Sequence, residues 1–154
     1  MGKVRFTGSC LNGGESVVEI ENSNEFGLYL HEDSTPPVKI PYDIERVHIN
    51  NHSVTVGTQK QLHVVEHLFS ALFGLNLYGV RVDVYGNEIP FFDGSSQDFA
   101  RALEELAYDR GRSLRSTRCV EVVAAEGIIS YSPLETDDLI VDMSLDHPHI
   151  GAQN

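Results

Sequence analysis

The sequence of 154 residues has few basic side chains and little cysteine. Its 11 lysines and arginines are outnumbered by 23 aspartates and glutamates, which gives a formal net charge of −12. Because binding through nucleic-acid phosphates requires a basic face, this composition argues against a nucleic-acid partner. Cys10 and Cys119 form no spaced pattern, which favours reduced structural thiols over a disulfide framework or a cysteine-rich zinc site.

Long apolar runs are also missing. No stretch approaches the roughly 18 apolar residues that a membrane-spanning helix requires. Residues 1–5 lead into alternating rather than continuous apolar sequence, unlike a signal peptide. We therefore expect a cytoplasmic protein with no transmembrane segment. The 41% apolar content is ordinary for a globular protein, and a chain of this length can bury one good core with an appended piece of a second.

The first half of the chain contains short apolar segments separated by turn residues. Strands are predicted at residues 4–6, 17–20, 26–30, 46–49 and 53–56. The first two strands form a predicted hairpin, because Gly13 and Gly14 between them permit the positive φ of a tight turn. Pro36 and Pro37 interrupt the strand pattern, since proline cannot donate a hydrogen bond to a sheet.

Residues 63–74 combine helical periodicity with side chains that bind metals. Apolar residues recur at three- and four-residue steps at Val65, Leu68, Phe69, Leu72 and Leu75. Another face of the predicted helix carries His63, Glu66, His67 and Ser70. Two helical histidines four residues apart can bind one zinc ion, and a glutamate between them can accept a proton from metal-bound water. The alternative is that these are ordinary packed or exposed helix residues.

A strand and a second helix follow. Residues 80–85 alternate with period two, which indicates a half-buried strand. Phe99, Leu103 and Leu106 share one face of a predicted helix with Ala102, and Ser95 and Asp98 have the spacing of a capping box. Together with the earlier strands, this order predicts an α+β fold. It is a two-layer domain in which both helices lie on one face of a mainly antiparallel sheet.

The remaining residues contain only predicted strands. Arg115 to Arg118 form a basic linker, and strands are predicted at 119–124, 128–131 and 139–145. Two or three strands without a covering helix are marginal in water and expose pairing edges. We therefore expect a first domain at residues 1–114. Residues 115–154 are then a linker and the opening strands of an incomplete second domain. The remainder of that domain is on another chain, has been removed by truncation, or is replaced by self-association.

Two motifs resemble the zinc-dependent UDP-3-O-acyl-N-acetylglucosamine deacetylases. Residues 64–72 resemble the family pattern Thr-Val-Glu-His-Leu-x-Ser-Ala-Leu, and residues 88–95 resemble Glu-Ile-Pro-x-x-Asp-Gly-Ser. Residues 145–153 also resemble an early strand of the family's second domain. The similarity covers nearly all of this chain but only the amino-terminal half of a family enzyme. Such enzymes consist of two similarly folded domains with the active site between them.

The resemblance implies the amino-terminal part of a zinc-dependent amidohydrolase that deacetylates UDP-3-O-acyl-N-acetylglucosamine in lipid A biosynthesis. Glu66 matches the family's general base and His67 matches a Zn²⁺ ligand, whereas His63 falls on no ligand position. The remaining zinc ligands of the family lie on a His-Lys-x-x-x-Asp helix in the second domain, and no such motif occurs here. We therefore expect the chain to be catalytically incompetent without that domain.

The other matched segments have supporting roles by the same resemblance. Thr55 to Gly57 match a segment that precedes the active-site helix. Asp93, Gly94 and Ser95 are expected to close a turn and start a helix. His147 and His149 do not correspond to family ligands.

Two other functions stay open at this level. Residues 63–67 fit the inverted zincin pattern His-x-x-Glu-His, which is typical of a self-contained metallopeptidase-like site. Alternatively, the domain keeps the fold without chemistry and acts as a non-catalytic interaction domain. If the protein is the deacetylase, its expected partner is the nucleotide-sugar acyl substrate. In the interaction domain, strand-edge pairing favours a complementary second-domain chain or a homo-oligomer.

Overall fold

The computed structural model describes residues 2–32, 36–50, 53–106, 117–124, 127–136, 140–149 and 151–153. The chain divides into two compact units, Met1–Ser113 and Leu114–Asn154. The interpretation of the second unit as the opening of a second domain stays a prediction. In the part of the chain that is described, no helix has the length and apolar character needed to cross a membrane.

The first unit is built on a five-stranded sheet with the order β1-β2-β8-β3-β4. These strands are β1 (Lys3–Ser9), β2 (Glu15–Asn22), β3 (Gly27–His31), β4 (Val38–Lys39) and β8 (Val80–Tyr85). Neighbours are antiparallel except β3 and β8, which are parallel. The predicted hairpin is confirmed: β1 pairs with β2, Phe6 lies opposite Val18, and Gly13 and Gly14 take φ values of 89° and 87° in the turn.

A separate three-stranded antiparallel sheet follows in the chain. It consists of β5 (Val47–Asn50), β6 (Ser53–Gly57) and β7 (Gln61–His63), and the 3₁₀ turn η1 (Ile44–Arg46) precedes it. The strands predicted at 46–49 and 53–56 are confirmed, whereas β7 was not predicted. The turn between β6 and β7 depends on Gly57, which has a φ of +117°. A Cβ at Gly57 would lie 2.2 Å from the carbonyl oxygen of Lys60, so this turn requires glycine.

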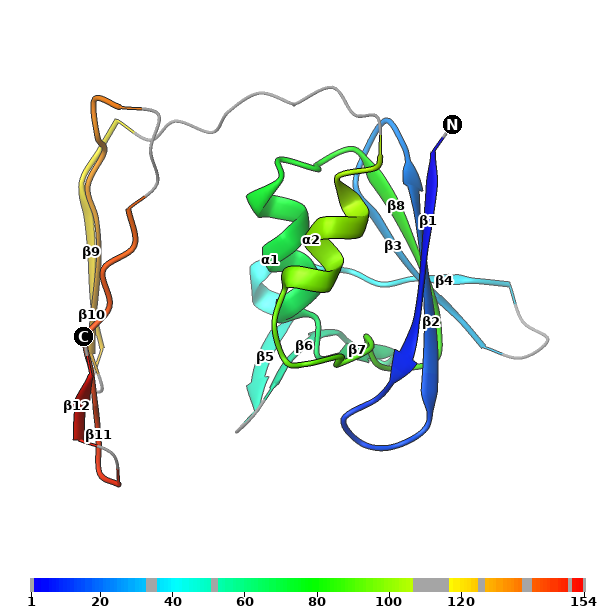
Figure 1. The fold of residues 1–154 in the computed structure, drawn as a ribbon, viewed down its shortest axis with the longest axis horizontal. Helices are drawn as coiled ribbons and strands as arrows, with labels where there is room; N and C mark the ends of the chain where they lie inside the picture. Colours follow the sequence, from blue (N-terminus) through cyan, green and yellow to red (C-terminus); the bar gives the residue numbers. More distant parts are fainter. Residues whose placement is uncertain are drawn as a thin grey trace. The chain divides into compact units, whose positions relative to one another are not determined.

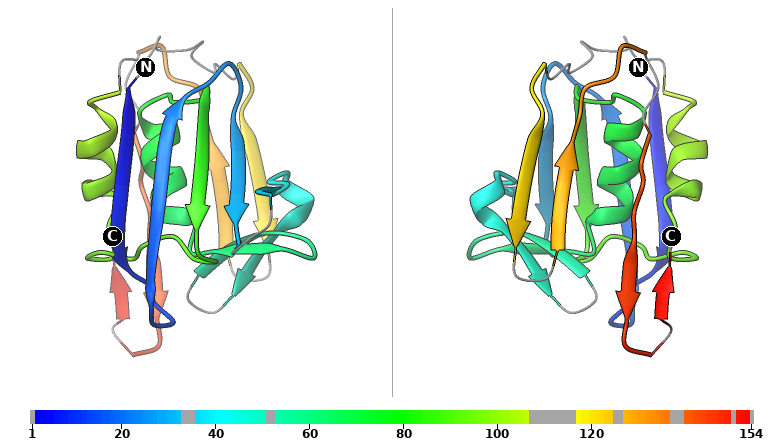
Figure 2. Two further views of the ribbon diagram at one scale, coloured as in Figure 1. Left: turned by 90° about the vertical axis from the view of Figure 1, so that its right-hand side faces the viewer. Right: turned by 90° about the vertical axis from the view of Figure 1, so that its left-hand side faces the viewer.

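Two helices, α1 (Glu66–Gly74) and α2 (Gln97–Leu103), cover one face of the five-stranded sheet (Figure 1). Figure 2 shows the strands of this sheet face-on. Alternate residues of the strands point to the helices: Val82 and Val84 of β8 are buried together with Leu68 and Phe99 of the helices. This arrangement confirms the predicted two-layer α+β fold, because one buried sheet face and two apolar helix faces share a single core.

The start of α1 differs from the prediction. The helix expected over residues 63–74 begins at Glu66, and His63 belongs to β7. The backbone of His63 pairs with the loop after β8: its N–H donates to Asn87 O at 3.0 Å, and Ile89 N–H donates to His63 O at 3.0 Å. Val64 then takes a φ of 59°. Because the N–H and carbonyl groups of His63 are used for strand pairing, they cannot take part in the first turn of a helix.

The predicted capping box at α2 is also wrong. The residue before the helix is Ser96, and it makes no side-chain capping bond. Instead, Ser95 Oγ accepts a hydrogen bond from Gln97 N–H at 3.2 Å, and Asp93 Oδ1 accepts one from Ser95 N–H at 2.9 Å. The predicted structural role of Asp93 and Ser95 is thereby confirmed, since together they close the turn and bind the first backbone donor of α2.

The described residues of the second unit form two hairpins. One pairs β9 (Val120–Ala124) with β10 (Gly127–Tyr131), and the other pairs β11 (Leu145–His147) with β12 (Gly151–Gln153). The first pair confirms the strands predicted at 119–124 and 128–131. The long strand predicted at 139–145 is wrong for residues 140–144, which have no regular structure, and residue 139 lies outside the described residues. Arg115 of the predicted linker also lies outside them.

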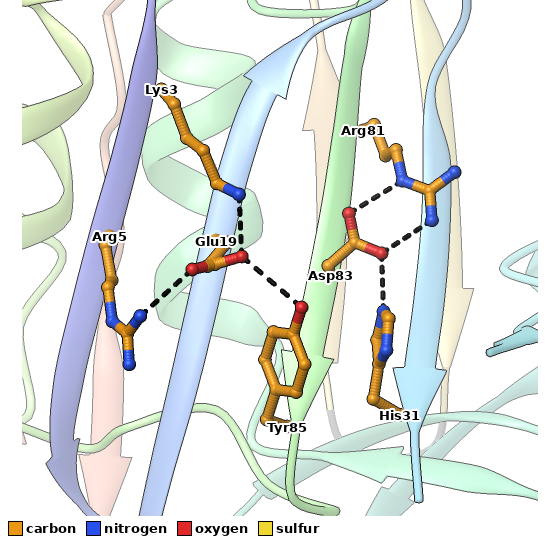
Figure 3. Close-up of polar contacts among 7 residues, drawn as sticks. All are labelled: Lys3, Arg5, Glu19, His31, Arg81, Asp83 and Tyr85. Carbon is orange, nitrogen blue, oxygen red and sulfur yellow. Dashed lines mark hydrogen bonds and ion pairs between the residues drawn. The ribbon is translucent and has the colours of Figure 1, made fainter. Parts of the chain in front are cut away.

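A network of charged and aromatic side chains covers the sheet face opposite the helices (Figure 3). Asp83 accepts two hydrogen bonds of 2.7 Å from Arg81, and its Oδ1 lies 2.6 Å from His31 Nε2. The ring of Tyr85 stacks on His31. Partial burial by itself would raise the pKa of the Asp83 carboxyl. The hydrogen bonds from Arg81 and His31 outweigh burial and hold that pKa below its usual range.

The lowered pKa of Asp83 predicts a loss of stability in acid. The folded-state pKa lies below the unfolded value of about 3.9. The ionised carboxylate therefore stabilises the fold fully above the unfolded value, and this contribution disappears as the pH falls through the folded value. Urea unfolding of the wild type and Asp83→Asn should show a difference in unfolding free energy that shrinks below about pH 4. Glu105→Gln, at an exposed carboxylate outside the network, is the control, and a pH-independent difference for Asp83→Asn would contradict the assignment.

Candidate active site

The start of α1 places Glu66 against strand β6. Glu66 Oε2 accepts a hydrogen bond from Val54 N–H at 3.0 Å, and Val65 N–H donates to Val54 O at 3.2 Å. Val54 therefore binds both the carboxylate and the backbone that leads into the helix. The Glu66 side chain is 28% exposed. One carboxylate oxygen is held by a backbone donor, so the carboxylate has a fixed orientation at a solvent-accessible position.

His67 lies directly beside this carboxylate. The distance from His67 Nε2 to Glu66 Oε1 is 3.8 Å, which is too long for a hydrogen bond. The imidazole packs edge-to-face on the Phe91 ring, with the ring centroids 5.6 Å apart and the planes at 83°. The site thus presents a carboxylate oxygen and an imidazole nitrogen side by side. These are the two kinds of group that water activation at a metal requires.

His63 is turned to a different set of partners. Its Nδ1 lies 3.0 Å from the Thr55 hydroxyl oxygen, which also accepts a hydrogen bond from Asn50 Nδ2 at 3.2 Å. Because that oxygen accepts from Asn50, the Thr55 hydroxyl hydrogen is available to His63. Thr55 is 1% exposed and His63 is half-buried, so this is a partly buried link between β6 and β7. The prediction that both histidines lie on one helix is wrong, because His63 belongs to β7 and His67 to α1, so the helical spacing that suggested the metallopeptidase-like alternative is not present.

The loop after β8 brings two further side chains close to His67. Phe91 contacts the imidazole through its ring. Hydrogen bonds from the Ser95 hydroxyl and backbone N–H hold the pKa of the Asp93 carboxyl below its usual range, and the charge of His67 acts in the same direction. The motif over residues 88–95 therefore lies next to the motif over residues 64–72. The sequence showed both motifs but not their contact.

The described residues do not complete a zinc site on their own. Zinc sites in proteins use three or four protein ligands. Within the part of the chain that the structure describes, no group of three or more histidine, cysteine, aspartate or glutamate side chains is arranged to hold a metal ion. His67 can supply one nitrogen ligand, and the Glu66 carboxylate lies beside it. A bound metal would need ligands from elsewhere.

Two contacts at the candidate site were missed by sequence reasoning. The backbone N–H of Val54 orients Glu66, and the ring of Phe91 contacts His67. No sequence signal identifies Val54, because any residue other than proline provides the same donor. Phe91 stands at a position that the family pattern leaves unspecified.

Comparison with known proteins agrees with the resemblance seen in the sequence. The family model for UDP-3-O-acyl N-acetylglycosamine deacetylase (LpxC) matches residues 1–154. Proteins named UDP-3-O-acyl-N-acetylglucosamine deacetylase from Geotalea uraniireducens, Campylobacter hominis and Campylobacter concisus are each 29% identical to the chain. The alignments cover 98% of this chain in each case, and 52%, 53% and 53% of the respective relatives. The chain therefore spans about half the length of the curated relatives it matches.

Proposed function

Because the chain belongs to the UDP-3-O-acyl N-acetylglycosamine deacetylase family, we propose that it forms the amino-terminal half of a cytoplasmic deacetylase. The enzyme hydrolyses the N-acetyl group of UDP-3-O-acyl-N-acetylglucosamine in lipid A biosynthesis. The observation that supports this proposal best is the adjacency of Glu66 and His67, with Glu66 Oε2 held by Val54 N–H. A fixed carboxylate beside a metal-binding imidazole suits hydrolysis of an amide.

We assign different roles to the two side chains. Glu66 is the general base: with one oxygen bound to Val54, its carboxylate is oriented to accept a proton from the attacking water. His67 is one ligand of a zinc ion. The family resemblance places the other protein ligands, a histidine and an aspartate, in the second domain. A single histidine binds zinc weakly, so the chain by itself is not expected to turn over substrate.

Reconstitution with a second domain tests this function. The chain should be combined with a complementary domain that carries a His-Lys-x-x-x-Asp helix. We expect the pair to bind about one zinc ion, because a zinc site needs three or four protein ligands and His67 supplies one of them. The pair should also release acetate from UDP-3-O-acyl-N-acetylglucosamine, measured together with zinc content after dialysis.

The matched control is the same pair with His67→Ala, which should lose both zinc and activity. A reconstituted, zinc-loaded pair without deacetylation would contradict the proposed reaction. If the pair forms but binds no zinc, the chain is instead a non-catalytic interaction domain.

A further inference from the structure

Glu88 is a buried acid that the proposed chemistry does not use. It lies in the loop after β8 and is 2% exposed. Burying a carboxylate is costly unless hydrogen bonds replace its hydration. None of the salt bridges in the described part of the chain involves Glu88. Its position therefore depends on neutral donors.

Both oxygens of Glu88 bind the turn between β1 and β2. Leu11 N–H donates to Oε1, and Asn12 Nδ2 donates to Oε2 at 2.8 Å. Burial raises the pKa of the neighbouring Cys10 thiol, and the charge of Glu88 raises it further. The Glu88 side chain thus joins two distant segments, since Leu11 and Asn12 lie 77 and 76 positions before it in the sequence.

The same loop is attached to its surroundings by backbone hydrogen bonds. Asn87 and Ile89 pair with His63 of β7, three residues before α1 begins at Glu66. Phe91 N–H donates to Ser9 O at 3.0 Å, at the end of β1. Residues 87–91 therefore lie between the β1–β2 turn and the strand that leads into the active-site helix.

The loop contacts His67 through one side chain, the ring of Phe91. Phe91 is three residues after Glu88 and packs edge-to-face on the His67 imidazole. We expect a change at the Glu88 anchor to be transmitted to Phe91, because at most about 10 Å of chain separates the two residues and both are bound to the end of β1 or to the turn after it. Phe91 therefore covers one side of the His67 ring in the described structure.

We propose that Glu88 is a positioning residue. By fixing the Cys10–Gly14 turn to the loop of residues 87–91, its carboxylate holds the Phe91 ring against His67 and thereby fixes the orientation of the imidazole. Any effect of this orientation on metal binding by His67 rests on the proposed function, whereas the orientation of the His67 ring does not. The competing interpretation is that Glu88 only fastens the hairpin turn.

The first test uses NMR of the 154-residue chain without metal. Glu88→Ala should shift the Leu11 amide and also the His67 ring proton and nitrogen resonances, because the ring-current field of Phe91 changes at His67. Glu88→Gln should keep His67 near its wild-type resonances, since the amide still offers an oxygen to Leu11 N–H and Asn12 can reverse its own amide to accept. Glu19→Ala, at a carboxylate on the opposite sheet face, is the control and should leave His67 unmoved.

Two results would overturn the proposal. One is a Glu88→Ala chain in which the turn amides shift and the His67 ring does not. If Glu88→Ala fails to fold, Asn12→Ala and Phe91→Leu replace it. Both should displace the His67 resonances, and unchanged resonances in both would equally reject the positioning role.

The second test separates this proposal from the proposed function. In the reconstituted two-domain enzyme, Glu88→Ala should weaken zinc binding or lower kcat by about 10-fold or more. Effects of this size are usual when a residue that orients a metal ligand is substituted. Glu88→Gln should stay close to wild type. If the enzyme has no deacetylase activity but the NMR result holds, the proposed function fails and the positioning role stands. If the enzyme is active and Glu88→Ala changes neither zinc affinity nor kcat, the positioning role fails.

Discussion

Glu66→Gln should lower the kcat of the reconstituted deacetylase by about 10²–10⁴-fold, because an amide cannot accept a proton from the attacking water. The glutamine oxygen can still accept the hydrogen bond that Val54 N–H donates to Glu66 Oε2. The substitution therefore removes the base while it keeps the local geometry. The measurement is acetate release at saturating substrate, so that kcat is compared directly.

Zinc content and thermal stability of the Glu66→Gln enzyme should match the wild type, since Glu66 is not assigned as a metal ligand. Glu104→Gln, at an exposed carboxylate after α2, is the matched substitution and should retain full activity. If Glu66→Gln keeps the wild-type kcat, the assignment of the general base is wrong. A loss of both zinc and activity would make Glu66 a ligand instead.

Phe99→Ala should lower the free energy of unfolding by about 3–5 kcal/mol, the usual cost of removing a buried phenylalanine side chain. Phe99 on α2 is fully buried, and its ring centroid lies 5.0 Å from those of Phe6 and Phe92. Its removal leaves a cavity where the helix layer meets the sheet, and it also ends two favourable aromatic contacts. Urea unfolding followed by circular dichroism measures the loss.

Phe73→Ala is the matched control, because this ring on α1 is 40% exposed. Phe73→Ala should lower the free energy of unfolding clearly less than Phe99→Ala does, since the Phe73 side chain removes less apolar area from water on folding. Equal costs would contradict the assignment of Phe99 to the centre of the core. Because Phe92 belongs to the same loop as Phe91, Phe99→Ala should also perturb the His67 ring resonances.

Periodicity and local turn chemistry were sufficient for most of the first unit. The alternation around Val82 and Val84 predicts β8, and the apolar spacing of Leu68 and Leu72 predicts the body of α1. These patterns work because a strand or helix that buries one face must repeat apolar residues at its own period. Glycines 13 and 14 similarly predict the hairpin turn. The family and the candidate residues Glu66 and His67 follow from two short motifs, although their chemical roles stay predictions.

The tertiary structure alone decided where α1 starts and what surrounds its first residues. Periodicity would extend the helix to His63, but the backbone of that residue pairs with Asn87 and Ile89, which lie more than twenty positions away. The orientation of Glu66 by Val54 N–H and of His67 by Phe91 likewise depends on segments that only the fold brings together. A local pattern states which faces of a segment are apolar. It does not state which distant backbone groups compete for its hydrogen bonds, and here that competition divides the two histidines between a strand and a helix.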